Sequence, residues 1–244
     1  MAKSPYKDRT LLLKEISSFT TRNGGFFKQN AKRMSDLFEM SVYNDAVKFY
    51  RRKKYTIRAK NIMRDGTFKY KLSTSGLNEN FSYFLAEKIK SGNTIDCVEI
   101  HHNIKVQSSH DPHIYFSADV SITKKDGTST EKQKNNRSHS YIPSGKLITF
   151  FEVKNMNPFP EVLFSFSGII YEIKPEFLLD PSALGIDFGR KHLTPCLVFS
   201  GGGGQHVESV CDKLGERYGC NIIRGLYINK GKIYSYDKLK TYDG

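Results

Sequence analysis

Two short apolar stretches predict the strands at the centre of the protein. Residues 115–122 and 148–155 are rich in aromatic and β-branched side chains and are bounded by turn-forming residues. Turn signals at 124–127 and 143–145 separate them, which allows the two strands to lie close together in one sheet.

Three segments have the spacing of helices. Residues 10–19 form a candidate helix, and apolar residues recur at helical spacing across 35–54, where Ser35 is the expected N-cap. The third segment follows residue 154, with a proline near its first helical position. Residues 162–173 within it are apolar on almost every side, which predicts a helix buried against the sheet.

The region before residue 115 reads mainly as strands. Residues 55–62 and 67–73 flank an Arg-Asp-Gly turn and predict a hairpin, and 96–107 predicts a long strand. Periodicity does not decide whether 80–88 is a short helix or a strand.

The C-terminal part alternates between strand and helix. Strands are expected at 193–200, 220–227 and 232–236, and a helix at 205–218. This order predicts parallel strands added to the same sheet. The predicted fold class is therefore α/β with α+β character, a mixed central β-sheet flanked by helices.

The chain divides into two parts in this interpretation. Residues 1–74 form a basic helical and hairpin region, which packs on a core formed by 75–244. The two parts are also compatible with one continuous domain, because 244 residues suffice for a single large core.

Composition limits the class of protein. The chain is 38% hydrophobic, which is too apolar for disorder, and it has no stretch of ~20 apolar residues that would span a membrane. The N-terminus lacks the apolar core of a signal peptide, so we expect a cytoplasmic protein. The four cysteines form no Cys-x-x-Cys pair and are expected to be free thiols.

The net charge indicates a partner. A formal charge of +13 is large for this length and favours a polyanion, of which nucleic acid is the commonest. The alternative is a lysine-rich surface that is simply solvated.

Candidate chemistry lies in the two central strands. Glu152 and Lys154 are two residues apart, so their side chains project from the same face of a strand. Asp119 interrupts the other apolar run, where an unpaired carboxylate would be costly to bury. Two carboxylates and a lysine would then converge on a site for a hard divalent cation such as Mg²⁺, with Mn²⁺ as a substitute.

At these residues the chain resembles the PD-(D/E)xK nuclease superfamily, which has the restriction-endonuclease-like fold. Asp119 matches the first acid of the motif, and Glu152-Val153-Lys154 matches its second half. Ala118 stands where the family has proline. The resemblance covers roughly residues 95–175 and is supported by the strand order and by the helix that follows.

The resemblance implies a Mg²⁺-dependent deoxyribonuclease, an endonuclease that acts in restriction or anti-phage defence. Its partners would be DNA and either a second copy of the chain in a homodimer or a partner protein of a defence complex. Asp119, Glu152 and the carbonyl of Val153 would hold the metal. Lys154 would act beside the attacking water, and Asn155 would contact the substrate.

Enzymes of this superfamily often add a third acid from a helix before the sheet. Glu39 is the first candidate for that role, and Glu79 or Glu87 is the alternative. Glu39 could equally be a solvated helix carboxylate.

Other interpretations remain open. One is a nucleic-acid-binding regulatory or structural subunit that carries out no catalysis. Asp187-Phe188-Gly189 matches a kinase tripeptide but lacks the other kinase motifs. The glycine run at 201–204 lacks the Lys-Ser/Thr of a phosphate-binding loop, so we interpret it as a turn.

Overall fold

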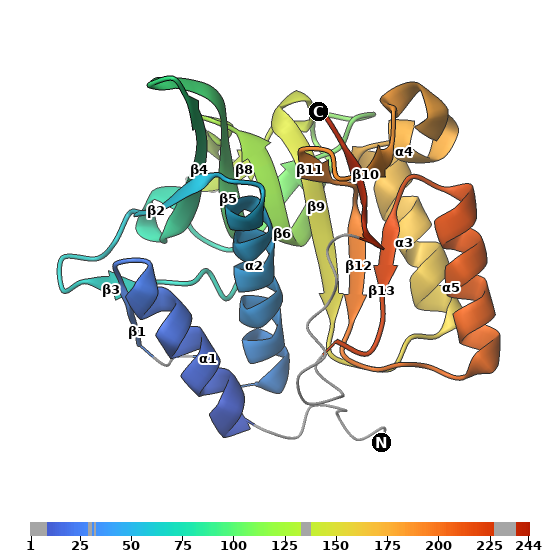
Figure 1. The fold of residues 1–244 in the computed structure, drawn as a ribbon, viewed down its shortest axis with the longest axis horizontal. Helices are drawn as coiled ribbons and strands as arrows, with labels where there is room; N and C mark the ends of the chain where they lie inside the picture. The colour runs from blue at the N-terminus through green and yellow to red at the C-terminus, as the bar shows by residue number, and fades with distance from the viewer. Residues whose placement is uncertain (1–8, 29–30, 32, 133–137, 227–237) are drawn as a thin grey trace.

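A large mixed β-sheet forms the centre of the protein, and helices lie on both sides of it (Figure 1). The computed structural model describes residues 9–28, 31, 33–132, 138–226 and 238–244. Its helices are α1 (Arg9–Arg22), α2 (Met34–Arg52), α3 (Pro160–Ile173), α4 (Glu176–Leu179) and α5 (Gln205–Arg217), with short 3₁₀ turns η1 (Asn78–Asn80), η2 (Ser144–Lys146) and η3 (Pro181–Leu184). No described helix has the length and apolar character needed to cross a membrane.

Seven strands follow one another across the large sheet. Their order is β13 (Asn221–Ile223), β12 (Cys196–Phe199), β9 (Leu147–Lys154), β6 (Tyr115–Lys124), β5 (Asn93–Gln107), β4 (Tyr83–Lys90) and β2 (Thr56–Lys60). β13, β12 and β9 are parallel, and the remaining neighbours are antiparallel. The mixed sheet flanked by helices agrees with the fold class predicted from the sequence.

Shorter strands complete the structure. β7 (Ser129–Lys132) and β8 (Ser138–Ile142) form a pair, and β8 also pairs with β5. Two small sheets lie outside the large one: β1 (Phe26–Phe27) with β3 (Thr67–Phe68), and β10 (Asp187–Phe188) with β14 (Lys240–Tyr242) and β11 (His192–Leu193).

Helices cover both faces of β9. Phe150 and Phe151 are consecutive and therefore point to opposite faces of the sheet. The ring of Phe150 lies 5.8 Å from that of Phe166 on α3, whereas Phe151 packs near Val42 of α2. Because both faces are covered, every residue of β9 from Leu147 to Val153 is buried, and Thr149 is the one polar residue before Glu152.

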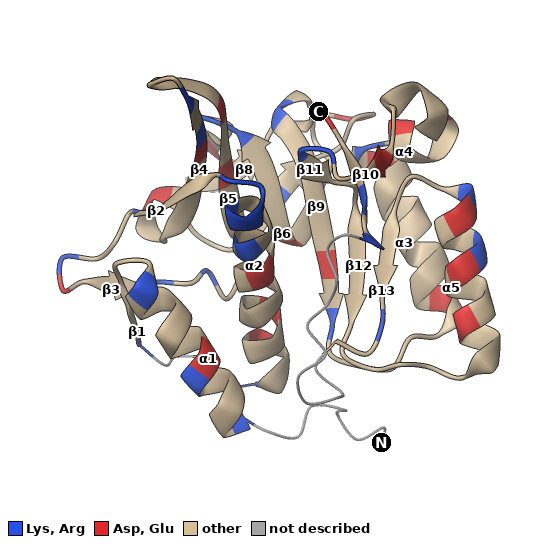
Figure 2. Cartoon of the chain, in the orientation of Figure 1, with Lys and Arg blue, Asp and Glu red and all other residues tan. Residues whose placement is uncertain are grey.

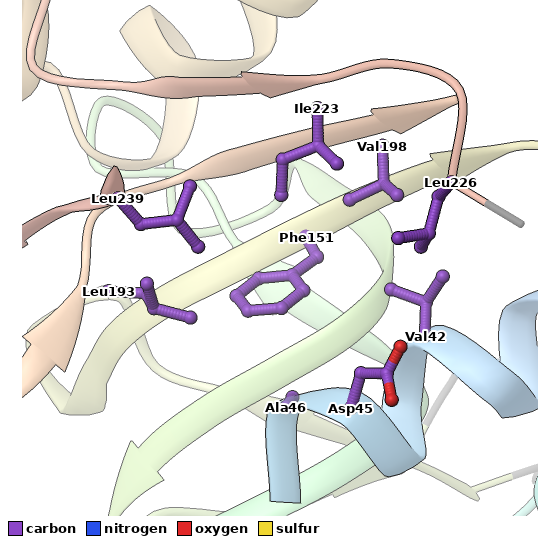
Figure 3. Close-up of a pocket in the computed structure, with 9 residues that line it drawn as sticks. All are labelled: Val42, Asp45, Ala46, Phe151, Leu193, Val198, Ile223, Leu226 and Leu239. Atoms are coloured by element: carbon purple, nitrogen blue, oxygen red, sulfur yellow. The ribbon is translucent and has the colours of Figure 1, made fainter. Parts of the chain in front are cut away.

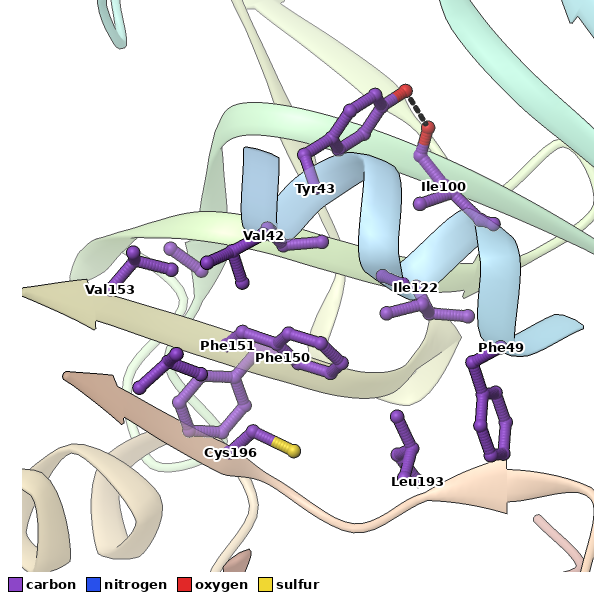
Figure 4. Packing of buried hydrophobic residues seen from close by; sticks show 14 of the residues in the cluster. Val42, Tyr43, Phe49, Ile100, Ile122, Phe150, Phe151, Val153, Leu193 and Cys196 are labelled. Carbon is purple, nitrogen blue, oxygen red and sulfur yellow. Dashed lines mark hydrogen bonds between the residues drawn. The ribbon is translucent and has the colours of Figure 1, made fainter. Parts of the chain in front are cut away.

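Helix α2 covers the face of the sheet opposite α3. It packs across the sheet through its apolar side chains (Figure 4), and the Tyr43 hydroxyl donates a 2.8 Å hydrogen bond to the Ile100 carbonyl. α1 in turn lies on α2, where Lys48 is 3.0 Å from Glu15. The N-terminal helices are thus joined to the sheet by a shared core.

One gap in this core is too small for a ligand. A cavity of about 20 Å³ lies between α2 and strands β9, β12 and β13 (Figure 3). Its lining is apolar apart from Asp45, whose carboxylate is 2.8 Å from the Lys48 ammonium. A volume of this size has room for about one water molecule and none for a substrate.

The structure corrects the predicted hairpin at 55–73. The turn exists, because the Gly66 amide donates to the Met63 carbonyl at 2.8 Å, but β2 and β3 diverge after it. β2 pairs with β4, and β3 pairs in parallel with β1. The Gly66 carbonyl accepts from the Phe26 amide at 2.8 Å, so β1 takes the place that the hairpin assigned to β2.

Helix α3 packs against the sheet as predicted, but not all of its apolar residues are buried there. Its contact with the core uses one stripe, formed by Leu163, Phe166, Ile170 and Ile173. Phe164 and Tyr171 lie on the other side and are 58% and 48% exposed. A stripe with this spacing is enough to hold a helix on a sheet, whatever the polarity of the opposite face.

Several boundaries differ from the predicted ones. Arg33, not Ser35, is the N-cap of α2, and its amide donates to Asp36 Oδ2 at 3.1 Å. The expected strand at 193–200 is divided into β11 and β12, and residues 80–88 form most of β4. The expected strand at 232–236 lies outside the described residues. All four cysteines are free thiols, as predicted.

The buried ring of His102 should make the stability of the fold depend on pH. Its ring is buried between Tyr43 and Tyr70. Burial lowers the pKa of His102 to about 3. The unfolded chain therefore binds this proton more tightly than the folded protein, and stability falls as the pH drops below about 6.5.

We predict that His102→Leu reduces this acid sensitivity by up to about 1.4 kcal/mol per pH unit between pH 6.5 and pH 4. Urea unfolding of the wild type and the variant at several pH values measures the difference. His113→Leu, at an exposed histidine, is the control and should follow the wild type. Parallel pH curves for the wild type and His102→Leu would contradict the prediction.

Candidate active site

The structure brings Asp119 and Glu152 together where β6 and β9 separate. The pairing between these strands includes Val120 and Phe151 but does not continue to the next two residues, Asp119 and Glu152. Instead, Asp119 Oδ2 accepts a 2.7 Å hydrogen bond from the Val153 amide. The carboxylate thus takes the position of a backbone acceptor, which fixes it at the opening between the strands.

Lys154 joins the same site. It lies two residues after Glu152 on β9, and its Nζ donates a hydrogen bond to Glu152 Oε1. Glu152 is only 7% exposed, and its Oε2 is buried without a partner among the described residues. A buried carboxylate oxygen without a donor is unfavourable, so this atom is an unused hydrogen-bond acceptor at the site.

The structure places Glu39 closer to this site than the other two candidate acids. Its carboxylate on α2 interacts electrostatically with Asp119 and Lys154. Glu79 lies in η1 beside a separate polar pocket, and Glu87 on β4 is 3.4 Å from Arg58. Of the three acids proposed for the helix position, Glu39 is the one that the fold brings near Asp119.

Asn103 is a residue of this site that the sequence analysis missed. It lies within β5 at φ +49°, a left-handed conformation that asparagine tolerates better than most residues. Its Nδ2 donates to Glu39 Oε2 at 3.3 Å and to the Lys71 carbonyl at 3.0 Å. Asn103 therefore ties α2 to the sheet beside Asp119. The signal in the sequence was an amide side chain in the middle of an apolar strand.

Asn155 is held at the end of β9. The Ser200 hydroxyl donates to Asn155 Oδ1 at 2.7 Å, and the Ser200 amide donates to the Lys154 carbonyl at 3.1 Å. Gly201 follows in close contact with the chain after β9, since a Cβ there would lie 2.0 Å from Asn157 Oδ1. The first glycine of the run is thus required by packing beside the site, in line with the predicted turn.

Burial and repulsion act together on the carboxylates. Burial raises the pKa of Asp119, and the charges of Glu152 and Glu39 raise it further. Burial also raises the pKa of Glu152 and of Glu39, with opposition from Lys154 at Glu152 and from the Asn103 hydrogen bond at Glu39.

Burial and the neighbouring carboxylates have opposite effects on the pKa of Lys154. Burial acts to lower its pKa, but the three carboxylates outweigh burial and raise it. Lys154 is therefore an ammonium at neutral pH and does not act as a base there. One ammonium faces three carboxylates, which leaves an excess of negative charge that a bound cation would relieve.

The donor atoms suit a hard cation. Asp119, Glu152 and the Val153 carbonyl offer only oxygen, the ligand that Mg²⁺ prefers, and Glu152 Oε2 has no competing donor among the described residues. Across the described ranges, no group of three His, Cys, Asp or Glu side chains is arranged to hold a metal ion. One or two carboxylates with waters are the usual Mg²⁺ ligands, so these residues fit such a site.

Comparison with known proteins adds no assignment. The chain matches no protein-family model, no curated protein and no solved structure.

We expect the closely spaced carboxylates to lower the stability of the folded protein. The pKa of Asp119 is higher in the folded protein than in the unfolded chain, so its ionisation weakens folding as the pH rises above about 3.9. We predict that Asp119→Asn raises the free energy of unfolding at pH 7 by on the order of 1 kcal/mol, because the amide keeps an oxygen for the Val153 amide and removes the charge.

Urea unfolding at pH 7 measures this gain. Asp187→Asn is the matched control, since Asp187 also accepts a backbone amide, from Phe188 at 2.7 Å, but is exposed. Its stability should stay near that of the wild type. A loss of stability in Asp119→Asn would show that the carboxylate stabilises the fold, against our account.

Proposed function

We propose that the protein is a Mg²⁺-dependent phosphodiester hydrolase that acts on DNA. The observation that carries the proposal is the convergence of Asp119, Glu152 and Lys154 at the opening between β6 and β9. Glu39 adds a third carboxylate to this group. Oxygen ligands beside a lysine ammonium are the set that metal-assisted phosphoryl chemistry requires.

Each residue has a role in this proposal. Asp119 and Glu152, with the Val153 carbonyl, bind the cation, and Glu39 completes the acidic group or holds a water. A bound Mg²⁺ would lower the pKa of the attacking water and stabilise the charge that develops on the phosphate. Lys154, which is charged, orients the water and neutralises the pentacovalent phosphate.

The substrate class follows from charge. A net charge of +13 favours a polyanion, and Lys and Arg occur on several elements of the fold (Figure 2). The resemblance to PD-(D/E)xK enzymes makes DNA the nucleic acid that we propose, and restriction or defence against foreign DNA the setting.

Cleavage of supercoiled plasmid in Mg²⁺, Mn²⁺ or EDTA tests the proposal. We predict metal-dependent nicking that falls by about 10²-fold or more in Glu152→Gln and Lys154→Ala, because each removes charge next to the reacting phosphate. Lys213→Ala, which changes an exposed lysine on α5, should keep full activity. DNA binding should survive in Lys154→Ala.

Two results would contradict the proposal. Full cleavage by Lys154→Ala would remove the lysine from the mechanism. Salt-sensitive DNA binding by the wild type, with no cleavage in any metal, would favour a binding subunit without catalysis.

A further inference from the structure

A pocket lined largely by charged residues lies toward the opposite ends of β6 and β9, the strands that carry the candidate active site. Its volume is about 490 Å³, within the range of small-ligand sites. Lys124 ends β6, five residues beyond Asp119, and Lys146 immediately precedes β9, six residues before Glu152. At about 3.3 Å per residue this is roughly 16–20 Å along each strand, so the pocket is separate from the candidate active site.

Lysines from distant parts of the sequence converge on this pocket. Lys124 and Lys125 come from the end of β6 and the turn after it, Lys146 from η2 and Lys191 from the segment before β11. Figure 2 shows basic segments on the loops around the end marked C. None of these four ammonium groups has an ion pair or hydrogen bond with a described residue.

The two acidic residues of the pocket already have partners. Asp96 Oδ2 accepts a hydrogen bond from the Tyr55 hydroxyl and lies 3.8 Å from His192 Nε2. Asp243 is 3.3 Å from Arg190. Four lysines therefore face two carboxylates that already have partners, and the pocket has an excess of positive charge.

We propose that this pocket binds a small phosphate-bearing anion of nucleotide size. Lysine ammonium groups bind phosphate as point charges, and several at one site relieve their mutual repulsion when an anion enters. The concave shape favours a compact ligand, because a DNA duplex would contact only the rim. This inference is independent of the nuclease proposal, since no residue is shared between the two sites.

Calorimetric titration in EDTA tests the pocket without the metal site. The probes are ADP, adenosine, inorganic phosphate and a DNA duplex of about 20 base pairs, in about 0.15 M NaCl to screen weak surface attraction. The pocket variant is Lys124→Glu/Lys146→Glu. The control, Lys14→Glu/Lys213→Glu, makes the same charge change on α1 and α5, at two exposed lysines that do not line the pocket.

We expect the wild type to bind ADP and phosphate but not adenosine. ADP binding should weaken by at least about 10-fold in the pocket variant and stay within about twofold in the control. Circular dichroism checks that both variants fold, as expected for exposed lysines.

Three results would overturn the inference. The first is no binding of ADP or phosphate by the wild type up to about 1 mM. The second is equal weakening in both variants, which would mean that net charge alone attracts the anion. The third is loss of duplex binding in the pocket variant without any ADP binding, which would make the lysines a contact for the DNA backbone.

Discussion

The structure depends on the burial of β9 on both faces. α2 covers one face and α3 the other, so every residue of the strand except Lys154 is buried. The strand nevertheless carries Glu152 at its end, at the point where β6 moves away and Asp119 bonds to the Val153 amide. The same constraint that builds the core therefore places two carboxylates in a partly dehydrated opening.

Charge in that opening is unbalanced. Lys154 pairs with Glu152, but Asp119 and Glu39 add negative charge, and burial raises the pKa of all three acids. An ion pair that only stabilised the fold would balance positive and negative charge more closely, and both oxygens of its carboxylate would accept hydrogen bonds. This group of three carboxylates and one lysine therefore lowers the stability of the fold, as functional sites commonly do. Asn103 and its contact to Glu39 show that the acid on α2 is held in place rather than left in solvent.

The sequence predicted the centre of the fold better than its edges. β5, β6, β9, α1, α2 and α5 follow from strong local patterns, and the period of two residues along a strand is enough to place Glu152 beside Lys154. The predicted hairpin at 55–73 was wrong although its turn exists, because the two strands pair with other segments and not with each other. β3 pairs with β1, which precedes α2 in the chain. Asn103 was missed because a left-handed residue inside a strand has no signature beyond the amide itself.

Binding of Mg²⁺ at Glu152 is the most direct test of a metal centre in this protein. Calorimetric titration of the wild type and Glu152→Gln with Mg²⁺, and with Mn²⁺, needs no substrate and no assumption about the reaction. We predict a single site in the wild type and at least about 10-fold weaker binding in the variant, because Oε2, which has no partner among the described residues, supplies a charged ligand. No binding in the wild type, or equal binding by both proteins, would contradict the claim that these residues form a metal centre.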